Sequence, residues 1–196
     1  MDKRICQFQR KTKETDISLE INLDGNRENK INSGIGFLDH LINAFSFHAN
    51  FDLKLLCKGD LQIDDHHTVE DCALALGSAI DKALGDRSGI ARFGYAYAPL
   101  DEALVRAVID FSGRSFSSID LKFNREKLGE LSTENISHFF QSLATTAKAT
   151  IHIDQIKGEN DHHKAEAAFK ALALAFRKAI VIRGEKGVAS TKGSLI

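Results

Sequence analysis

Two short segments of this chain each combine a histidine doublet with a glutamate at the same spacing. They are Asp65–Glu70 and Asp161–Glu166, which begin 96 residues apart, and each has an apolar helical run after it and a single histidine upstream. Imidazole and carboxylate groups are ligands of borderline divalent metal ions. Six of the chain's eight histidines belong to this pattern, which argues against chance. The sequence therefore predicts eight metal ligands: His40, His66, His67, Glu70, His138, His162, His163 and Glu166.

Helical geometry limits how these ligands can be shared. Successive helix residues are about 100° apart, so Glu70 shares a face with both His66 and His67, whereas the two imidazoles diverge. One ion can take either histidine together with Glu70, but hardly both. The economical arrangement is two ions, each with one histidine from each doublet, or about four protein ligands per ion. A six-coordinate ion such as manganese then keeps two positions open for a bidentate substrate, whereas closed tetrahedral zinc keeps none.

The aspartate that begins each segment has a different interpretation. Aspartate is a strong N-cap residue, because its side-chain oxygen accepts hydrogen bonds from the free backbone N–H groups of the first helical turn. We therefore expect Asp65 and Asp161 to cap the helices that follow, and not to ligate metal.

The elements that must position these side chains also repeat. In the first half, alternating apolar residues predict strands near residues 5–10, 17–23 and 51–56, with helices over 36–48 and 66–84. In the second half, strands are expected near 92–98, 103–111, 116–123 and 150–154, with helices over 133–148 and 162–182. The single histidines, His40 and His138, fall on the first helix of each half.

This order of elements predicts an internally duplicated α+β fold. We expect two similar half-units, each with helices packed on one face of a mostly antiparallel sheet, that share a tight interface. No linker rich in Gly, Ser or Pro separates independent domains. The predicted division is a first half-repeat at 1–86, a second at 87–183 and a C-terminal tail at 184–196, within one compact domain.

Composition excludes several classes of protein. The chain has 196 residues, 43% hydrophobic and 27% charged, with a net charge of −1, which is typical of a soluble globular protein. A pI near 6.7 argues against a nucleic-acid surface. No apolar run is long enough to span a membrane, and no signal peptide is apparent. Cys6, Cys57 and Cys72 lack metal or redox spacing, so we expect reduced thiols in a cytoplasmic protein.

Six segments, in this order, closely resemble the imidazoleglycerol-phosphate dehydratase family, and the likeness extends over essentially the whole chain. The chain resembles the monofunctional form, without an attached phosphatase. The segments are Arg10–Thr15, Gly34–His40, Asp65–Asp71, Ser137–Phe140, Asn160–Lys170 and Ser190–Gly193.

The resemblance implies a lyase of histidine biosynthesis. Such an enzyme removes water from imidazole glycerol phosphate to give imidazole-acetol phosphate, with manganese as cofactor and two ions per subunit. It also implies a large homo-oligomer, of about twenty-four subunits, with the sites between subunits.

The resemblance further assigns roles to residues outside the doublets. Glu14 matches a substrate-contacting carboxylate and is expected to shuttle the proton, although from its residue type alone it is a solvated charge beside Lys13. His48 matches another position in the substrate region. The substrate's phosphate needs positively charged donors, such as the forked guanidinium group of arginine and the ammonium group of lysine. The C-terminal tail is expected to supply some of them. The candidates are Arg92, Arg114, Lys170, Ser190 and Lys192.

Two other functions compete with this one. A dinuclear metal hydrolase of a phosphate ester would need two ions about 3.5–4 Å apart with a bridging carboxylate, and the sequence offers no clustered pair of aspartates for that role. A non-catalytic metal-binding protein would use the His-rich helices alone, with no need for Glu14 or for a phosphate clamp.

Overall fold

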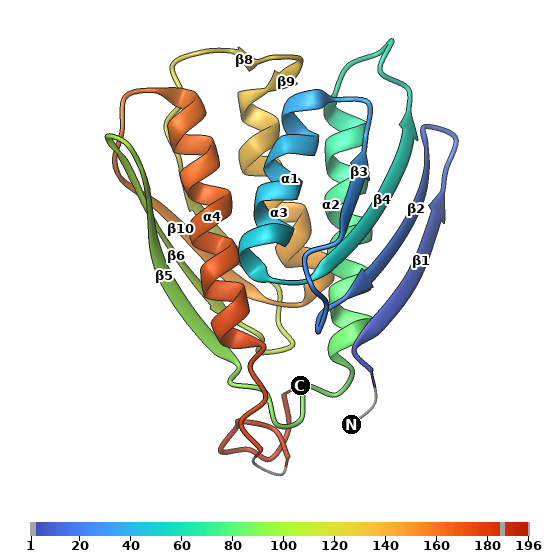
Figure 1. Cartoon of the computed structure of the whole chain (residues 1–196), viewed down its shortest axis with the longest axis vertical. Helices are drawn as coiled ribbons and strands as arrows, with labels where there is room; N and C mark the ends of the chain where they lie inside the picture. Colours follow the sequence, from blue (N-terminus) through green and yellow to red (C-terminus); the bar gives the residue numbers. More distant parts are fainter. Residues whose placement is uncertain (1–2, 185–186, 196) are drawn as a thin grey trace.

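The chain folds as two successive copies of one arrangement, which is three strands, a helix, a strand and a helix (Figure 1). The computed structural model describes residues 3–184 and 187–195. The first copy consists of β1 (Ile5–Lys11), β2 (Thr15–Asn22), β3 (Asn29–Asn32), α1 (Gly36–Ala49), β4 (Asp52–Gly59) and α2 (His66–Leu84). The second consists of β5 (Phe93–Leu100), β6 (Ala103–Asp110), β7 (Phe116–Asp120), α3 (Thr133–Ala147), β10 (Thr150–Lys157) and α4 (Asp161–Ala179), with the short strands β8 (Lys127–Leu128) and β9 (Leu131–Ser132) before α3.

Each copy forms one four-stranded sheet with the same topology. The strand orders are β1-β2-β4-β3 and β5-β6-β10-β7. All pairs are antiparallel except β3 with β4 and β7 with β10, so a single parallel edge strand completes each sheet. Successive side chains of β2 point to opposite faces of the sheet. Ile17, Leu19 and Ile21 are therefore buried against the helices, while the residues between them face outward.

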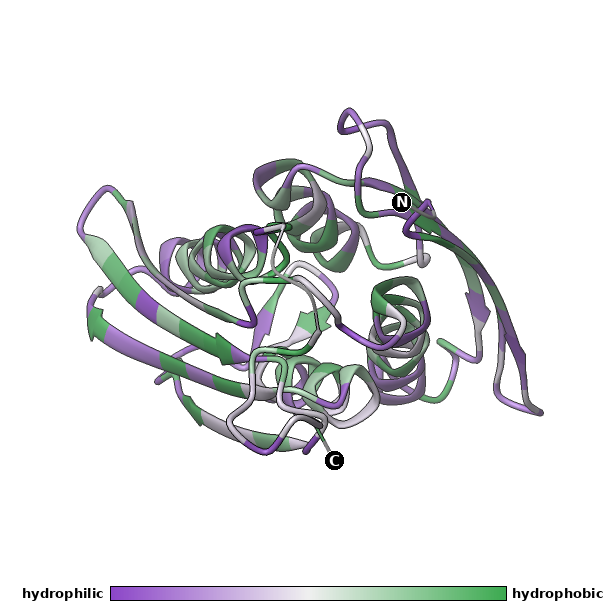
Figure 2. Cartoon of the chain, turned by 90° about the horizontal axis from the view of Figure 1, so that it is seen from below, coloured by the Kyte–Doolittle hydropathy of each residue, from purple (hydrophilic) through white to green (hydrophobic). Residues whose placement is uncertain are grey.

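The four helices form a layer between the two sheets (Figures 1 and 2). They pack in pairs that cross from one half to the other, because α2 contacts α3 and α1 contacts α4. The rings of Phe45 in α1 and Phe176 in α4 are 5.5 Å apart in the shared core. The pairing joins the halves and brings helix ends from different halves together.

The predicted fold class and the order of the main elements are confirmed. Two features were not predicted: the strand β3 and the β8–β9 hairpin. The segment Asn-Lys-Ile-Asn of β3 has one apolar residue, and it is a strand because β4 supplies its hydrogen-bond partners. None of the described helices is both long and apolar enough for a membrane span. The boundaries after residues 86 and 183 stay predictions, and residues 185, 186 and 196 of the predicted tail lie outside the described residues.

Candidate active site

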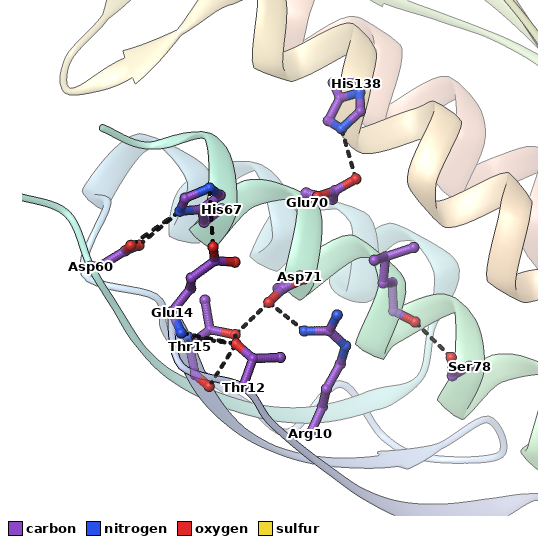
Figure 3. Close-up of polar contacts among 11 residues, drawn as sticks. Arg10, Thr12, Glu14, Thr15, Asp60, His67, Glu70, Asp71, Ser78 and His138 are labelled. Atoms are coloured by element: carbon purple, nitrogen blue, oxygen red, sulfur yellow. Dashed lines mark hydrogen bonds and ion pairs between the residues drawn. The ribbon is translucent and has the colours of Figure 1, made fainter. Parts of the chain in front are cut away.

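The first predicted ligand cluster forms where α2 meets α3. One ligand atom from each of His66, Glu70 and His138 lies within 4.8 Å of the other two. His138 Nε2 is 3.2 Å from Glu70 Oε1, as Figure 3 shows, and the His66 and His138 rings stack at 4.7 Å. His66 Nδ1 lies 3.1 Å from Asn135 Oδ1, a contact that holds the ring with Nε2 free to bind.

The second cluster forms where α4 meets α1. His40 Nε2 and His162 Nε2 lie 2.9 and 3.2 Å from the same Glu166 oxygen. Burial by itself would raise the pKa of Glu166, but hydrogen bonds from Lys170 and His40 lower that pKa to about 2. Glu166 is therefore a carboxylate at any physiological pH, which is the form that a metal ligand requires.

Helix pairing across the halves explains both clusters. In each, one helix contributes the first histidine of its doublet and the glutamate four residues later, which share a helix face. The facing helix, from the other half, contributes the single histidine. Of the two alternatives that helical geometry left open, the structure selects the pair at i, i+4, His66 with Glu70 and His162 with Glu166.

The second histidine of each doublet points away from both clusters. His67 Nδ1 lies 3.1 Å from Asp60 Oδ2, and His163 Nδ1 lies 2.7 Å from Glu102 Oε2. The hydrogen bonds to Asp60 and Glu102 raise the pKa values of His67 and His163, respectively. The structure thus differs from the expected sharing, because within one chain each cluster holds a histidine from one doublet only.

The two clusters fit divalent metal ions in the chemistry of their donors, two imidazoles and one carboxylate each. Three ligands per cluster are one fewer than expected, and His67 and His163 are the two predicted ligands left over. The Nδ1 atom of each ring is hydrogen-bonded to a carboxylate, which is the usual way that a protein orients an imidazole whose other nitrogen binds a metal.

The capping prediction for Asp65 and Asp161 is wrong. Neither carboxylate caps its own helix, because the buried Asp65 accepts hydrogen bonds from Ser132 and the buried Asp161 accepts from the backbone of a distant loop. The side chain one residue earlier binds the backbone N–H groups of the first turn instead, Asp64 in α2 and Asn160 in α4. Neither aspartate belongs to the two ligand clusters of the described residues.

Glu14 lies in the turn between β1 and β2, on the side of α2 that carries His67 (Figure 3). Its Oε1 is 3.7 Å from His67 Nε2, and its side chain is 52% exposed, so that a substrate can reach it. The turn is fixed locally, because the backbone N–H groups of Glu14 and Thr15 both donate to Thr12 Oγ1. Glu14 thus stands next to a predicted ligand histidine without belonging to a cluster.

His48 and Lys170 lie near the second cluster. Burial lowers the pKa of His48, and the nearby positive charge of Lys170 lowers it further. The Lys170 ammonium contacts the carboxylate of Glu166. The structure therefore separates Lys170 from the other phosphate candidates.

The remaining phosphate candidates lie together in a pocket of about 740 Å³. Arg92 is held there by Asp110, at 2.6 Å, and by a hydrogen bond to the carbonyl of Ala189, at 2.7 Å. The Ser190 hydroxyl accepts a hydrogen bond from the backbone N–H of Lys192. The four candidates that line the pocket are Arg92, Arg114, Ser190 and Lys192.

Within one chain this pocket is far from the second ligand cluster. The backbone N–H of Arg92 donates to the carbonyl of Ala179, at the end of α4, whereas His162 and Glu166 lie in its first turns. Seventeen residues of helix separate His162 from Ala179, roughly 25 Å at 1.5 Å per residue. A small substrate cannot reach the second cluster and the pocket of the same chain together.

Sequence reasoning missed the side chains that hold the site residues in place. Asp60 gives no signal, because its contact with His67 depends on how the loop after β4 folds. Glu102 could have been found by comparing the two hairpins, since Glu14 and Glu102 both occupy the second turn position. Asp71, next to Glu70, contacts Arg10 and Thr15 (Figure 3), which only the packing of α2 on the first sheet reveals.

Comparison with known proteins gives consistent results. The profile of the family described as imidazoleglycerol-phosphate dehydratase matches residues 33–176. A relative of that name from Phytophthora nicotianae is 57% identical over 98% of this chain, and one from Chloroherpeton thalassium is 53% identical over 98%. The chain spans 42% of the length of the first relative and 99% of the second.

Two solved structures share the fold. The imidazoleglycerol-phosphate dehydratase of Staphylococcus aureus matches with a TM-score of 0.83 at 36% identity, over 91% of this chain and 99% of that one. The Pyrococcus furiosus enzyme, in complex with (S)-C348, matches with a TM-score of 0.82 at 36% identity, over 95% and 99%. The profile match and the nearly full-length relatives show that this chain belongs to the imidazoleglycerol-phosphate dehydratase family.

Proposed function

We propose that this protein is a metal-dependent hydro-lyase that converts imidazole glycerol phosphate to imidazole-acetol phosphate and water, in histidine biosynthesis. The observation that carries the proposal is the pair of similar His-His-Glu clusters, each accompanied by a doublet histidine outside it. Family membership supports the same activity. The three buried, unpaired thiols of Cys6, Cys57 and Cys72 support a place in the cytoplasm.

We infer two manganese ions per subunit, one for each cluster. His66, Glu70 and His138 would hold one ion, and His40, His162 and Glu166 the other. A bound ion supplies a Lewis acid that withdraws charge from the substrate imidazole and orients the substrate. Open-site imidazole and carboxylate coordination suits manganese better than closed tetrahedral zinc.

The fourth protein ligand of each ion would come from another copy of the chain. His67 and His163 stand apart from the clusters of their own chain, and each has its Nδ1 paired to a carboxylate. The Nε2 of each ring is then the atom left for a metal ion in a neighbouring subunit. This arrangement restores one histidine from each doublet to each ion and supports the large homo-oligomer, of about twenty-four subunits, that the family resemblance implies.

The same reasoning applies to the substrate's phosphate. Because the pocket of Arg92, Arg114, Ser190 and Lys192 is far from the second cluster of its own chain, we propose that it clamps the phosphate of a substrate bound at a cluster of a neighbouring copy. The guanidinium groups supply forked donors and Lys192 a point charge. Lys170, beside Glu166, would contact the substrate from the cluster side.

Proton movement is assigned to Glu14. Dehydration requires loss of a weakly acidic C–H proton and of a hydroxyl group, so a group that takes and returns a proton must reach the substrate. The exposed carboxylate of Glu14, 3.7 Å from His67 Nε2, would lie beside the ion to which His67 binds. The half-buried imidazole of His48, whose pKa is lowered, is placed similarly near the second cluster.

The rival functions lack this support. A dinuclear hydrolase needs a carboxylate that bridges two ions, but in the described part of the chain Glu70 and Glu166 belong to different clusters. A metal-binding protein without catalysis has no use for a pocket that gathers Arg92, Arg114 and Lys192. Incubation of the purified protein with imidazole glycerol phosphate tests the proposal directly. Formation of imidazole-acetol phosphate is expected, whereas release of inorganic phosphate would favour the hydrolase and no turnover the metal-binding protein.

A further inference from the structure

Three polar side chains attach the β1–β2 turn to helix α2 (Figure 3). Thr15 Oγ1 donates to Asp71 Oδ2 at 2.5 Å, and the Arg10 guanidinium forms an ion pair with the same oxygen, without the alignment of a hydrogen bond. Thr15 is 3% exposed and Asp71 4%. A buried carboxylate is costly unless it is paired, so these contacts hold the strands and the helix in one arrangement.

The corresponding positions of the second half carry no polar side chains. The hairpin registers place Lys11 opposite Asp16 and Pro99 opposite Leu104, so Arg10 and Thr15 correspond to Ala98 and Ala103. Asp71 follows Glu70 as Ala167 follows Glu166. All three counterparts, Ala98, Ala103 and Ala167, are buried alanines, so the duplicated fold forms without the polar contacts.

The second half fixes its turn with the turn's own carboxylate. Glu102 is the counterpart of Glu14, and its Oε1 accepts hydrogen bonds from the backbone N–H groups of Glu159 and Asn160, at 3.1 and 2.8 Å. Its other oxygen binds His163. Both carboxylate oxygens of Glu102 are therefore bound by other groups of the second half.

In the first half, residues other than the turn glutamate orient the doublet histidine and hold the turn. Asp60 binds Nδ1 of His67, as Glu102 does for His163, and Asp71 with its two partners holds the turn. Among the described residues, the one side chain that pairs with the Glu14 carboxylate is His67, at 3.7 Å. The two halves therefore differ at the turn in a way that leaves one glutamate free for chemistry.

We propose that Asp71, together with Arg10 and Thr15, is a positioning residue for Glu14. The three side chains hold the turn at the height on α2 where the Glu14 carboxylate meets His67. The inference rests on the proposed function, in which Glu14 moves the proton. Small displacements of a reacting group are costly, on the order of 10²-fold for about 1 Å.

Two variants remove the contact with little change in shape, Thr15→Val and Asp71→Asn. Thr146→Val is the matched control, because Thr146 also donates its hydroxyl to α2, at the carbonyl of Leu74, away from the turn. We expect kcat to fall about 10- to 100-fold in both test variants, with KM and metal content unchanged, and less than about 2-fold in the control. An equal fall in kcat in the control, or a change in KM with kcat unchanged, would overturn the proposal.

The Glu14→Gln background separates positioning from general damage. If Thr15 and Asp71 act through Glu14, then Thr15→Val or Asp71→Asn costs no further activity once Glu14 has become glutamine. If either substitution lowered the activity of Glu14→Gln by the same factor as it lowers that of the wild type, these residues would act independently of Glu14. Full activity of Glu14→Gln alone would overturn the proposal as well. If Asp71→Asn fails to fold or loses metal, Thr15→Val decides, since it removes only a hydroxyl.

A measurement without substrate distinguishes this inference from the proposed function. Hydrogen–deuterium exchange of the turn peptide reports the amides of Glu14 and Thr15, which donate to Thr12. Faster exchange in Thr15→Val and Asp71→Asn than in Thr146→Val is expected, whatever reaction the protein catalyses. Unchanged exchange would overturn the inference, whereas a wild-type protein that does not dehydrate imidazole glycerol phosphate would overturn the proposed function.

Discussion

At the scale of single residues, the carboxylates of the site fall into separate classes. Glu70 lies within hydrogen-bond distance of His138, and Glu166 of His40 and His162, whereas Glu102 and Asp60 orient the histidines that lie outside. Glu14 belongs to neither class, since its side chain is exposed and meets only His67 among the described residues. The structure therefore gives five similar side chains three different tasks, which residue type alone does not distinguish.

This division predicts different defects for two conservative substitutions. Glu14→Gln keeps the shape but cannot accept and return a proton, so turnover should fall by about 10²–10⁴-fold while metal content and substrate affinity stay unchanged. Glu70→Gln removes charge from a ligand cluster and should lose metal instead. Metal content, KM and kcat of the two variants provide the comparison. A metal-depleted Glu14→Gln protein, or one with wild-type turnover, would contradict the assignment.

The doublet histidines predict how metal binding depends on pH. Hydrogen bonds to Asp60 and Glu102 raise the pKa values of His67 and His163 above the ordinary 6.5. Only the neutral imidazole binds metal, so a raised pKa lets protons compete with the ion at a higher pH. Metal affinity should therefore begin to weaken above pH 6.5 as the pH falls, and weaken further below it. Metal content after gel filtration on both sides of this pH tests the expectation, and full retention at pH 5 would exclude ligation by these rings.

At the scale of elements, the cross-pairing of helices between halves builds the clusters. Close approach of α2 and α3 depends on Gly77, since a Cβ there would lie 2.2 Å from Thr146 Oγ1 and 2.7 Å from the carbonyl of Leu143. The same pair of helices carries the three ligands of the first cluster. Packing of this helix pair and metal binding are thus linked.

Replacement of this glycine should harm stability and metal binding together. Overpacking in Gly77→Ala costs about 1–3 kcal/mol, more than the roughly 1 kcal/mol that alanine gains over glycine in a helix. Gly36→Ala is the matched control, because a Cβ at the start of α1 meets nothing within 4 Å. Thermal denaturation and metal titration should show a loss in Gly77→Ala alone. Equal melting temperatures of the two variants would mean that α2 and α3 can separate without cost.

Sequence patterns predicted the elements better than their contacts. Periodicity located the long helices and the strands of both halves, because each buries one regular face. It missed β3, whose single apolar residue leaves no pattern. The spacing of the doublets predicted that the two histidines of a doublet part. It did not predict that the second histidine joins neither cluster of its own chain, since that depends on Asp60 and Glu102 from other elements.

At the scale of the whole molecule, one chain holds only parts of the proposed site. Each cluster has three ligands, the doublet histidines His67 and His163 lie apart, and the basic pocket is at the far end of α4. In the proposed function, several copies join these parts, with ions at the contacts between them. Assembly, metal binding and activity should then rise and fall together.

Stepwise return of manganese to the chelated protein tests this account most directly. Subunit assembly by light scattering, bound metal and formation of imidazole-acetol phosphate are measured on the same samples. Without metal, small and inactive particles are expected, and activity and particle mass should rise together to a plateau at two ions per chain, one for each cluster. Chelated protein that keeps its full assembled mass or its activity would contradict the central claim that ions between subunits complete the active site.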